Sequence, residues 1–282
     1  MVLTGATGLK TFDQNMDSVI PNEQTLLQIQ VPNPQNLAWD LVFHQEINRL
    51  AHGENLQRRL EEITAHLGHF DRVFVLGCGR SGTWLLMQLL STLKDQDIVP
   101  QELPVEAFGL FATRTSRLLI KRHFLSYKTI QRIPPGVRII YIVRHPYDVL
   151  TSHNPVTKRD YHIQPERWME EIKALSLLMA SGREHVKVIR YEDLVSNPVH
   201  MQAELAAFLG AEIAMSPEEI SPSLRLGEST QIAMHGVRKI DTNSVGKYHR
   251  DPRKLEYLRS IRGQLGETLL WISATFDYDI GI

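Results

Sequence analysis

The stretch from Val73 to Leu86 constrains this chain more than any other, because β-branched and aromatic residues there pass into a glycine-rich turn. An apolar pattern with the 3.6-residue spacing of a helix follows the turn. Glycines let backbone N–H groups converge on an anion, and the positive end of the following helix points at the same place. The stretch therefore predicts a buried strand, a phosphate-binding loop and a helix.

This loop differs from the P-loop of nucleotide triphosphatases. Gly77 and Gly82 have the G-x-x-x-x-G spacing, but Thr83-Trp84 stands where that motif has Lys and then Ser or Thr. The cation here is Arg80, and a guanidinium can bind an oxyanion through two parallel hydrogen bonds. On these residues alone, a strand-to-helix turn whose glycines serve only packing explains the pattern equally well.

Composition narrows the class of protein. The 282 residues, 43% hydrophobic and 22% charged, suffice for one large or two small domains. A formal net charge of -1 gives no reason to expect a nucleic-acid-binding protein, and no apolar run approaches the length of a membrane span. Cys78 is the single cysteine, which fits a reducing compartment, and the first residues do not resemble a signal peptide. We expect a soluble cytoplasmic protein.

The domain organisation predicted from the sequence has two parts. Residues 1–36 are polar and contain three prolines, which indicates an arm rather than a folding unit. Residues 37–282 are expected to form a single domain, in which residues 37–70 are helical and Gly53 separates two helices.

Beyond the glycine loop, apolar strands alternate with amphipathic helices. Strands are expected at 118–121, 138–143 and 186–190, and helices at 146–153, from Pro165 onward, and before Gly210. This alternation predicts an α/β fold with a doubly wound parallel sheet flanked by helices on both faces.

The residues at the strand ends indicate what the sheet binds, because ligands of such sheets lie at the carboxyl ends of the strands. Arg144 follows the strand at 138–143, where a nucleotide triphosphatase would carry an Asp for Mg²⁺. We therefore expect anionic groups to be bound directly, without a metal. Ser152, expected two helical turns further on, could hold one phosphate together with Arg144. A surface ion pair between Arg144 and Asp148 is the alternative.

Four segments in this order and approximate spacing resemble the sulfotransferases that use 3′-phosphoadenosine 5′-phosphosulfate (PAPS). The resemblance covers about residues 72–250, and its motifs are residues 74–83, 144–152, 191–198 and 244–248. It implies a P-loop-like α/β fold, with PAPS as donor, its desulfated product PAP, and no metal.

The resemblance also implies roles for particular residues. The first motif would bind the 5′-phosphosulfate through Gly79, Arg80, Ser81, Gly82, Thr83 and Trp84. Arg144 and Ser152 would hold the 3′-phosphate, Tyr191 would lie against the adenine, and Arg238-Lys239 is similar to a basic segment over the 3′-phosphate. Arg80 replaces the Lys of cytosolic members but is found in carbohydrate-type and bacterial ones. The acceptor class therefore stays open among small molecules, lipids and saccharides.

The catalytic base is expected in Lys121-Arg122-His123, which resembles the Lys-x-His of the same family. An acceptor hydroxyl must lose a proton as it attacks sulfur, and His has the side-chain pKa nearest to neutral pH. Lys121 and Arg80 would stabilise charge on the departing phosphate oxygen. The alternative is that His123 is simply an exposed residue of a basic turn.

Two other functions share parts of this pattern. A nucleotide-dependent phosphotransferase would use a similar loop, but it should need Mg²⁺ and the Walker lysine. A non-catalytic nucleotide-binding module would bind the nucleotide without transferring any group.

Overall fold

The computed structural model describes residues 58, 61, 72–111, 117–122, 125–153, 159–220 and 240–282. The predicted arm, residues 1–36, lies outside the described residues. The same holds for the predicted helical part, residues 37–70, apart from Arg58 and Glu61.

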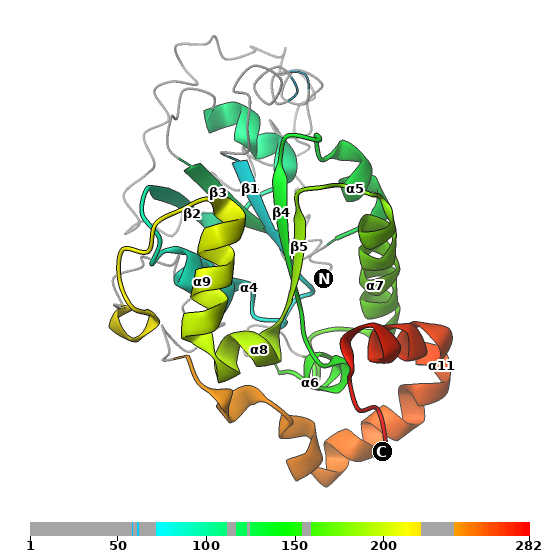
Figure 1. Cartoon of the computed structure of the whole chain (residues 1–282). Coiled ribbons are helices and arrows are strands. Elements are labelled where there is room, and N and C mark those ends of the chain that lie inside the picture. The colour runs from blue at the N-terminus through cyan, green and yellow to red at the C-terminus, as the bar shows by residue number, and fades with distance from the viewer. Residues whose placement is uncertain are drawn as a thin grey trace, which may run out of the picture. The chain divides into compact units, whose positions relative to one another are not determined.

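A five-stranded parallel sheet forms the centre of the described residues (Figure 1). Its strands are β1 (Arg72–Leu76), β2 (Gln96–Glu102), β3 (Arg117–Arg122), β4 (Arg138–Val143) and β5 (Val186–Arg190). Their order in the sheet is β2-β3-β1-β4-β5, so the chain builds one side of β1 first and then the other. Such a reversal opens a crevice at the carboxyl ends of β1 and β4, where ligands of doubly wound sheets bind. The predicted α/β class is confirmed.

Helices cover both faces of this sheet (Figure 1). The α-helices are α4 (Thr83–Leu90), α5 (Tyr127–Arg132), α6 (Pro146–Leu150), α7 (Pro165–Ala180), α8 (Tyr191–Ser196), α9 (Pro198–Leu209) and α11 (Pro252–Phe276). Short 3₁₀ turns are η1 (Val105–Phe111), η2 (Pro217–Glu219), η3 (Thr242–Ser244) and η4 (Lys247–Arg250).

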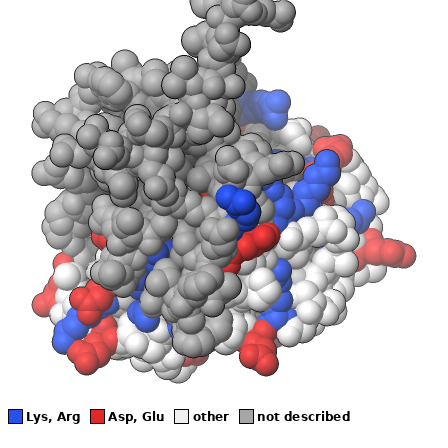
Figure 2. Space-filling view, turned by 90° about the horizontal axis from the view of Figure 1, so that it is seen from above, with Lys and Arg blue, Asp and Glu red and all other residues white. Residues whose placement is uncertain are grey.

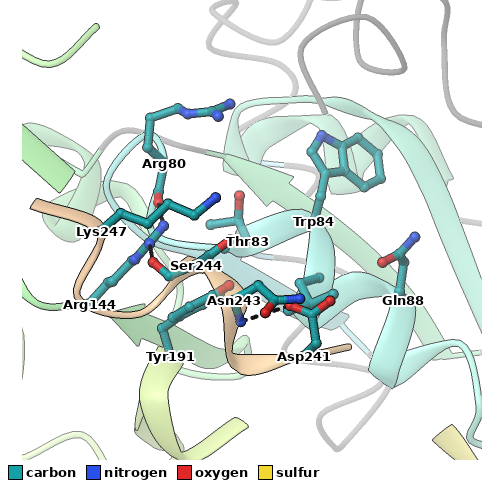
Figure 3. Close-up of a pocket in the computed structure, with 12 residues that line it drawn as sticks. Arg80, Thr83, Trp84, Gln88, Arg144, Tyr191, Asp241, Asn243, Ser244 and Lys247 are labelled. Carbon is teal, nitrogen blue, oxygen red and sulfur yellow. Dashed lines mark hydrogen bonds between the residues drawn. The ribbon is translucent and has the colours of Figure 1, made fainter. Parts of the chain in front are cut away.

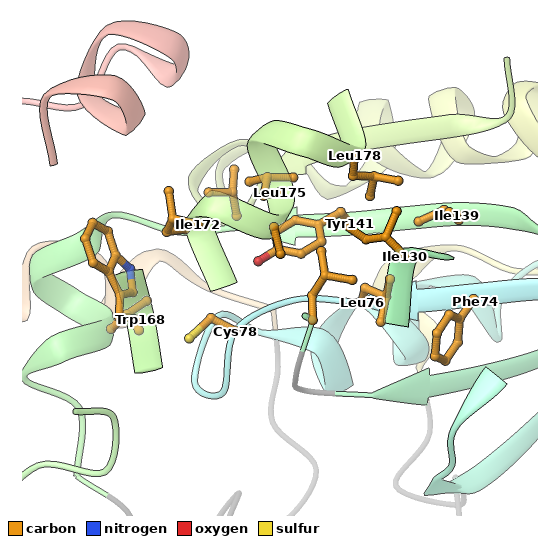
Figure 4. Packing of buried hydrophobic residues seen from close by; sticks show 14 of the residues in the cluster. Phe74, Leu76, Cys78, Ile130, Ile139, Tyr141, Trp168, Ile172, Leu175 and Leu178 are labelled. Carbon is orange, nitrogen blue, oxygen red and sulfur yellow. The ribbon is translucent and has the colours of Figure 1, made fainter. Parts of the chain in front are cut away.

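The alternation of side chains along the strands divides the buried residues into two clusters. Val73 and Val75 of β1 pack with α4, α8 and α9 on one face, whereas Phe74 and Leu76 pack with α5, α7 and α11 on the other. Figure 4 shows the second cluster, in which Trp168, Ile172, Leu175 and Leu178 of α7 lie over the sheet. Because every residue of β1 is buried, the glycine loop that follows it starts from a fixed point.

Two local predictions differ from the structure. The strand β2 was not predicted, because its sequence is polar and contains Pro100; it is an edge strand whose register shifts between Ile98 and Glu102. The helix expected at 146–153 ends at Leu150, and the Thr151 hydroxyl donates to the carbonyl of Tyr147. Ser152 therefore lies after the helix.

The surface charge of the described residues is mixed. On the face seen in Figure 2, the visible Lys and Arg side chains are interspersed with Asp and Glu. This distribution agrees with the formal net charge of -1.

Candidate functional site

A pocket of about 270 Å³ lies where the glycine loop enters α4 (Figure 3). It is lined by Arg80, Gly82, Thr83, Trp84, Leu85, Gln88, Arg144, Tyr191, Asp241, Asn243, Ser244 and Lys247. Arg80, Gly82, Thr83, Trp84, Arg144 and Tyr191 were predicted as binding residues, and the structure brings these six together.

The glycines of the loop are required by close backbone contacts. A Cβ on Gly77 would lie 2.7 Å from the carbonyl oxygen of Ile142. Gly82 has a φ of 101°, and a Cβ there would lie 2.5 Å from Cδ2 of Tyr191. Side chains at either position would push the loop away from β4 and from Tyr191. The glycines thus serve packing, and the same packing closes one wall of the pocket.

The N-terminus of α4 has the features of an anion site. Gly82 is its N-cap, no described side chain caps the helix, and its first turn carries no acidic residue. The first N–H groups of a helix have no carbonyl partner within it, and the helix dipole makes this end positive. An anion in the pocket would therefore be bound by backbone groups as well as by side chains.

Arg144 is held in place by several groups. Its Nη1 donates to the carbonyl of Arg80 at 3.0 Å, and its Nη2 donates to the carbonyl of Ser244. The guanidinium carbon lies 4.4 Å from the centre of the Tyr191 ring, and Nη2 lies 3.7 Å from a carboxylate oxygen of Asp148. The ion pair considered as an alternative for Arg144 is present, and Arg144 lines the pocket as well.

Ser152 pairs with Arg80 in the structure. Nε of Arg80 donates to Oγ of Ser152 at 3.0 Å, and Ser152 is not among the described residues that line the pocket. Arg80 has a φ of 72°, an uncommon left-handed conformation for a residue other than glycine. That Ser152 and Arg144 hold one phosphate together stays a prediction.

Lys247 lines the pocket and belongs to the motif at residues 244–248, but the sequence indicated no role for it. It begins η4, directly after Gly246, whose φ is 66°. Nearby, the Asp241 carboxylate accepts a hydrogen bond of 2.9 Å from the backbone N–H of Asn243. The glycine before Lys247 was the signal in the sequence, because it marks the sharp turn that brings this lysine to the pocket.

Lys121 lies behind the pocket wall. Its side chain is fully buried, Nζ pairs with the Glu102 carboxylate, and Nζ lies 4.4 Å from the centre of the Trp84 ring. Burial lowers the pKa of Lys121 well below its usual value, whereas the carboxylate favours the charged form. Glu102 was missed because the strand β2 that carries it was missed.

The remaining predicted residues fall into two groups. Gly79 and Ser81 belong to the loop, and Ser81 is buried with an Oγ that has no hydrogen-bond partner among the described residues. His123, Arg238 and Lys239 lie outside the described residues.

A buried polar cluster lies below the loop, on the face of α7. Glu171 is fully buried, and its carboxylate accepts a hydrogen bond of 3.1 Å from Nε of Arg167. Burial raises the pKa of Glu171 to about 8, against the opposing effect of Arg167. Burial, and then the nearby Glu171, raise the pKa of the Cys78 thiol. This cluster supports the loop from beneath.

The described part of the chain has neither a metal-binding cluster nor a membrane-spanning helix. In it, no group of three or more His, Cys, Asp or Glu side chains is arranged to hold a metal ion. None of the helices found there has the length and apolar character needed to cross a membrane.

The fold and the pocket define a parallel α/β protein with a glycine loop and an arginine- and lysine-lined pocket at the switch point of its sheet. Residues 111–215 match the model of the sulfotransferase family. The matched stretch includes Lys121, Arg144, Ser152 and Tyr191, and it begins after the glycine loop. The match covers less than half of the 282 residues, and over this stretch the chain is similar to that family.

The comparison with curated proteins found no match. Among solved structures, the chain is similar to mouse sulfotransferase SULT7A1 complexed with PAP (18% identity, 74% of this chain, 88% of that chain, TM-score 0.47). It is also similar to the sulfotransferase domain of the Synechococcus PCC 7002 olefin synthase (18%, 74%, 95%, TM-score 0.49). A third is retinol dehydratase in complex with androsterone and the inactive cofactor PAP (14%, 80%, 87%, TM-score 0.40).

Proposed function

We propose that this protein transfers the sulfuryl group of PAPS to a hydroxyl or amine of a small-molecule, lipid or saccharide acceptor. One observation carries the proposal: the uncapped N-terminus of α4 meets Arg80, Arg144 and Lys247 in a single pocket. A doubly charged nucleotide end needs several positive groups, and here backbone dipoles and side chains supply them together. The single cysteine is consistent with the cytoplasm as the place of action.

In this proposal the loop residues Gly79 to Trp84 bind the 5′-phosphosulfate. Arg144 and Ser152 bind the 3′-phosphate, Tyr191 lies against the adenine, and Arg238-Lys239 adds charge over the 3′-phosphate. Ser152 also accepts a hydrogen bond from Nε of Arg80, which fixes the guanidinium beside the loop. Lys247 is an additional cation for the phosphates.

The proposed reaction is an in-line displacement at sulfur. His123 takes the proton of the acceptor hydroxyl while the oxygen forms its bond to sulfur, and the bond from sulfur to the 5′-phosphate oxygen breaks. PAP leaves with its electron pair on that oxygen. Arg80 and the N–H groups of the loop stabilise the new charge, and Lys121 adds positive charge behind Trp84.

Calorimetry with PAP in the presence and absence of EDTA tests the donor. We expect PAP to bind equally in both, and labelled PAPS with a panel of acceptors to give a sulfated product. Tight binding of ATP with Mg²⁺ and none of PAP would favour a phosphotransferase instead. Binding of PAP with no transfer to any acceptor class would favour the non-catalytic module.

A further inference from the structure

The pocket has two chemically different ends. Figure 3 shows Arg80, Arg144 and Lys247 at one end and the side chains of Trp84 and Gln88 at the other. Gln88 lies on α4, five residues beyond Thr83 at the helix start, or about 7.5 Å along the axis. An anion at the helix N-terminus and a group that contacts Gln88 would therefore belong to the two ends of one ligand.

The side-chain nitrogen of Gln88 is buried without the hydrogen-bond acceptor that a buried amide N–H requires. Gln88 is 1% exposed, and its Nε2 has no hydrogen-bond partner among the described residues. Gln202, which is 2% exposed, is different: its Nε2 donates to Oγ1 of Thr92 at 2.6 Å and to the carbonyl of Met215 at 2.7 Å. Buried polar groups are nearly always paired in native proteins. Since Gln88 lines a pocket, its missing partner is expected on the ligand.

The amide group limits what that partner can be. A primary amide presents an acceptor oxygen and a donor nitrogen side by side. The edge of adenine that carries N6 and N7 presents the complementary pair, because the N6 amino group is a donor and N7 is an acceptor. On the corresponding edge guanine presents two acceptors, O6 and N7, and hypoxanthine presents the same two. Neither base can therefore satisfy both atoms of the amide through this edge.

We propose that Gln88 reads the edge of the adenine ring and thereby sets the selectivity of the pocket for adenine nucleotides. This inference rests on the proposed function, because that function makes the occupant a nucleotide whose phosphates lie at the cationic end. Gln88 was not among the binding residues predicted from the sequence. Gln88 follows Trp84 by four residues, so the two side chains lie on the same buried face of α4. An apolar residue is expected at such a position.

Calorimetry with three ligands tests this: PAP, its hypoxanthine analogue, and 1-deoxyribose 3,5-bisphosphate, which has no base. A bidentate contact to a base typically discriminates about 5- to 150-fold, and we expect the wild type to prefer PAP over the hypoxanthine analogue within that range. Gln88→Leu should reduce this preference to about threefold or less and leave the affinity for the base-free bisphosphate unchanged. Gln88→Met, which keeps the length of the side chain, is the second variant should Gln88→Leu fold poorly.

Gln131→Leu is the matched control, since Gln131 is exposed on α5 and away from the residues that line the pocket. It should retain the wild-type preference. A wild-type preference that persists in both Gln88 variants would overturn the inference while the binding of PAP still supports the proposed function. Equal loss of PAP and of the base-free bisphosphate would also overturn it, because the residue would then support the fold alone. Failure of the wild type to bind PAP would overturn the proposed function and this inference with it.

Discussion

Glu171 makes the stability of this protein depend on pH in a direction opposite to that of an ordinary carboxylate. It lies on α7, fully buried, and burial raises its pKa from 4.5 to about 8. Between these values the unfolded chain carries an ionised Glu171 and the folded chain a protonated one, so folding takes up one proton. The contribution of Glu171 to stability therefore falls as pH rises from about 4.5 to 8 and is constant above that window.

The size of the effect follows from one proton. Each pH unit inside the window changes the unfolding equilibrium constant by about tenfold, so two units change it by about a hundredfold. Glu171→Gln removes the titration but keeps the shape of the side chain and an acceptor for Nε of Arg167. We expect its stability to depend less on pH than that of the wild type, and to exceed it at pH 8.

Urea denaturation followed by circular dichroism, at intervals from pH 5.5 to 8.5, measures both curves. Glu170→Gln is the control, because Glu170 is exposed on the same helix and should keep the wild-type dependence. Parallel curves for the wild type and Glu171→Gln would refute the reasoning. They would mean that Arg167 holds Glu171 ionised in the folded state, so that burial is not the larger effect.

Much of the sheet could be predicted because its inner strands are short apolar runs. β1, β3 and β4 follow the expected ranges closely, since strands buried on both faces leave an unbroken apolar signature. β2 could not be predicted in this way, because an edge strand needs few apolar residues and tolerates Pro100. Because β2 carries the Glu102 that pairs with Lys121, the sequence did not predict this ion pair either.

The pocket was predicted in part for a similar reason. The loop and Arg144 follow buried strands, and their places at the carboxyl edge of the sheet are fixed by topology. Lys247 and Asn243 come from a segment of 3₁₀ turns about 100 residues further on, which has no periodic pattern to align with the sheet. Two contacts hold this segment: the Asp148 carboxylate accepts a 2.7 Å hydrogen bond from the backbone N–H of Gly246, and Nη2 of Arg144 donates to the carbonyl of Ser244.

The remaining predictions concern the catalytic base and the loop. His123→Ala should lower turnover by about a hundredfold or more and leave PAP affinity nearly intact, whereas Lys121→Ala should lower both; calorimetry and initial rates on a confirmed acceptor separate the two. His123→Ala with most of its activity retained would place the base on another residue. Gly82→Ala should lower both the melting temperature and the affinity for PAP, because its Cβ would lie 2.5 Å from the Tyr191 ring at a φ of 101°. The left-handed backbone alone costs alanine about 1 to 2 kcal/mol, and any further loss must come from moving Tyr191, which also carries the Arg144 guanidinium on its face. Introduced into Tyr191→Ala, Gly82→Ala should therefore cost less stability than it does in the wild type, and an equal cost in both backgrounds would show that the ring is not what excludes a side chain at this position.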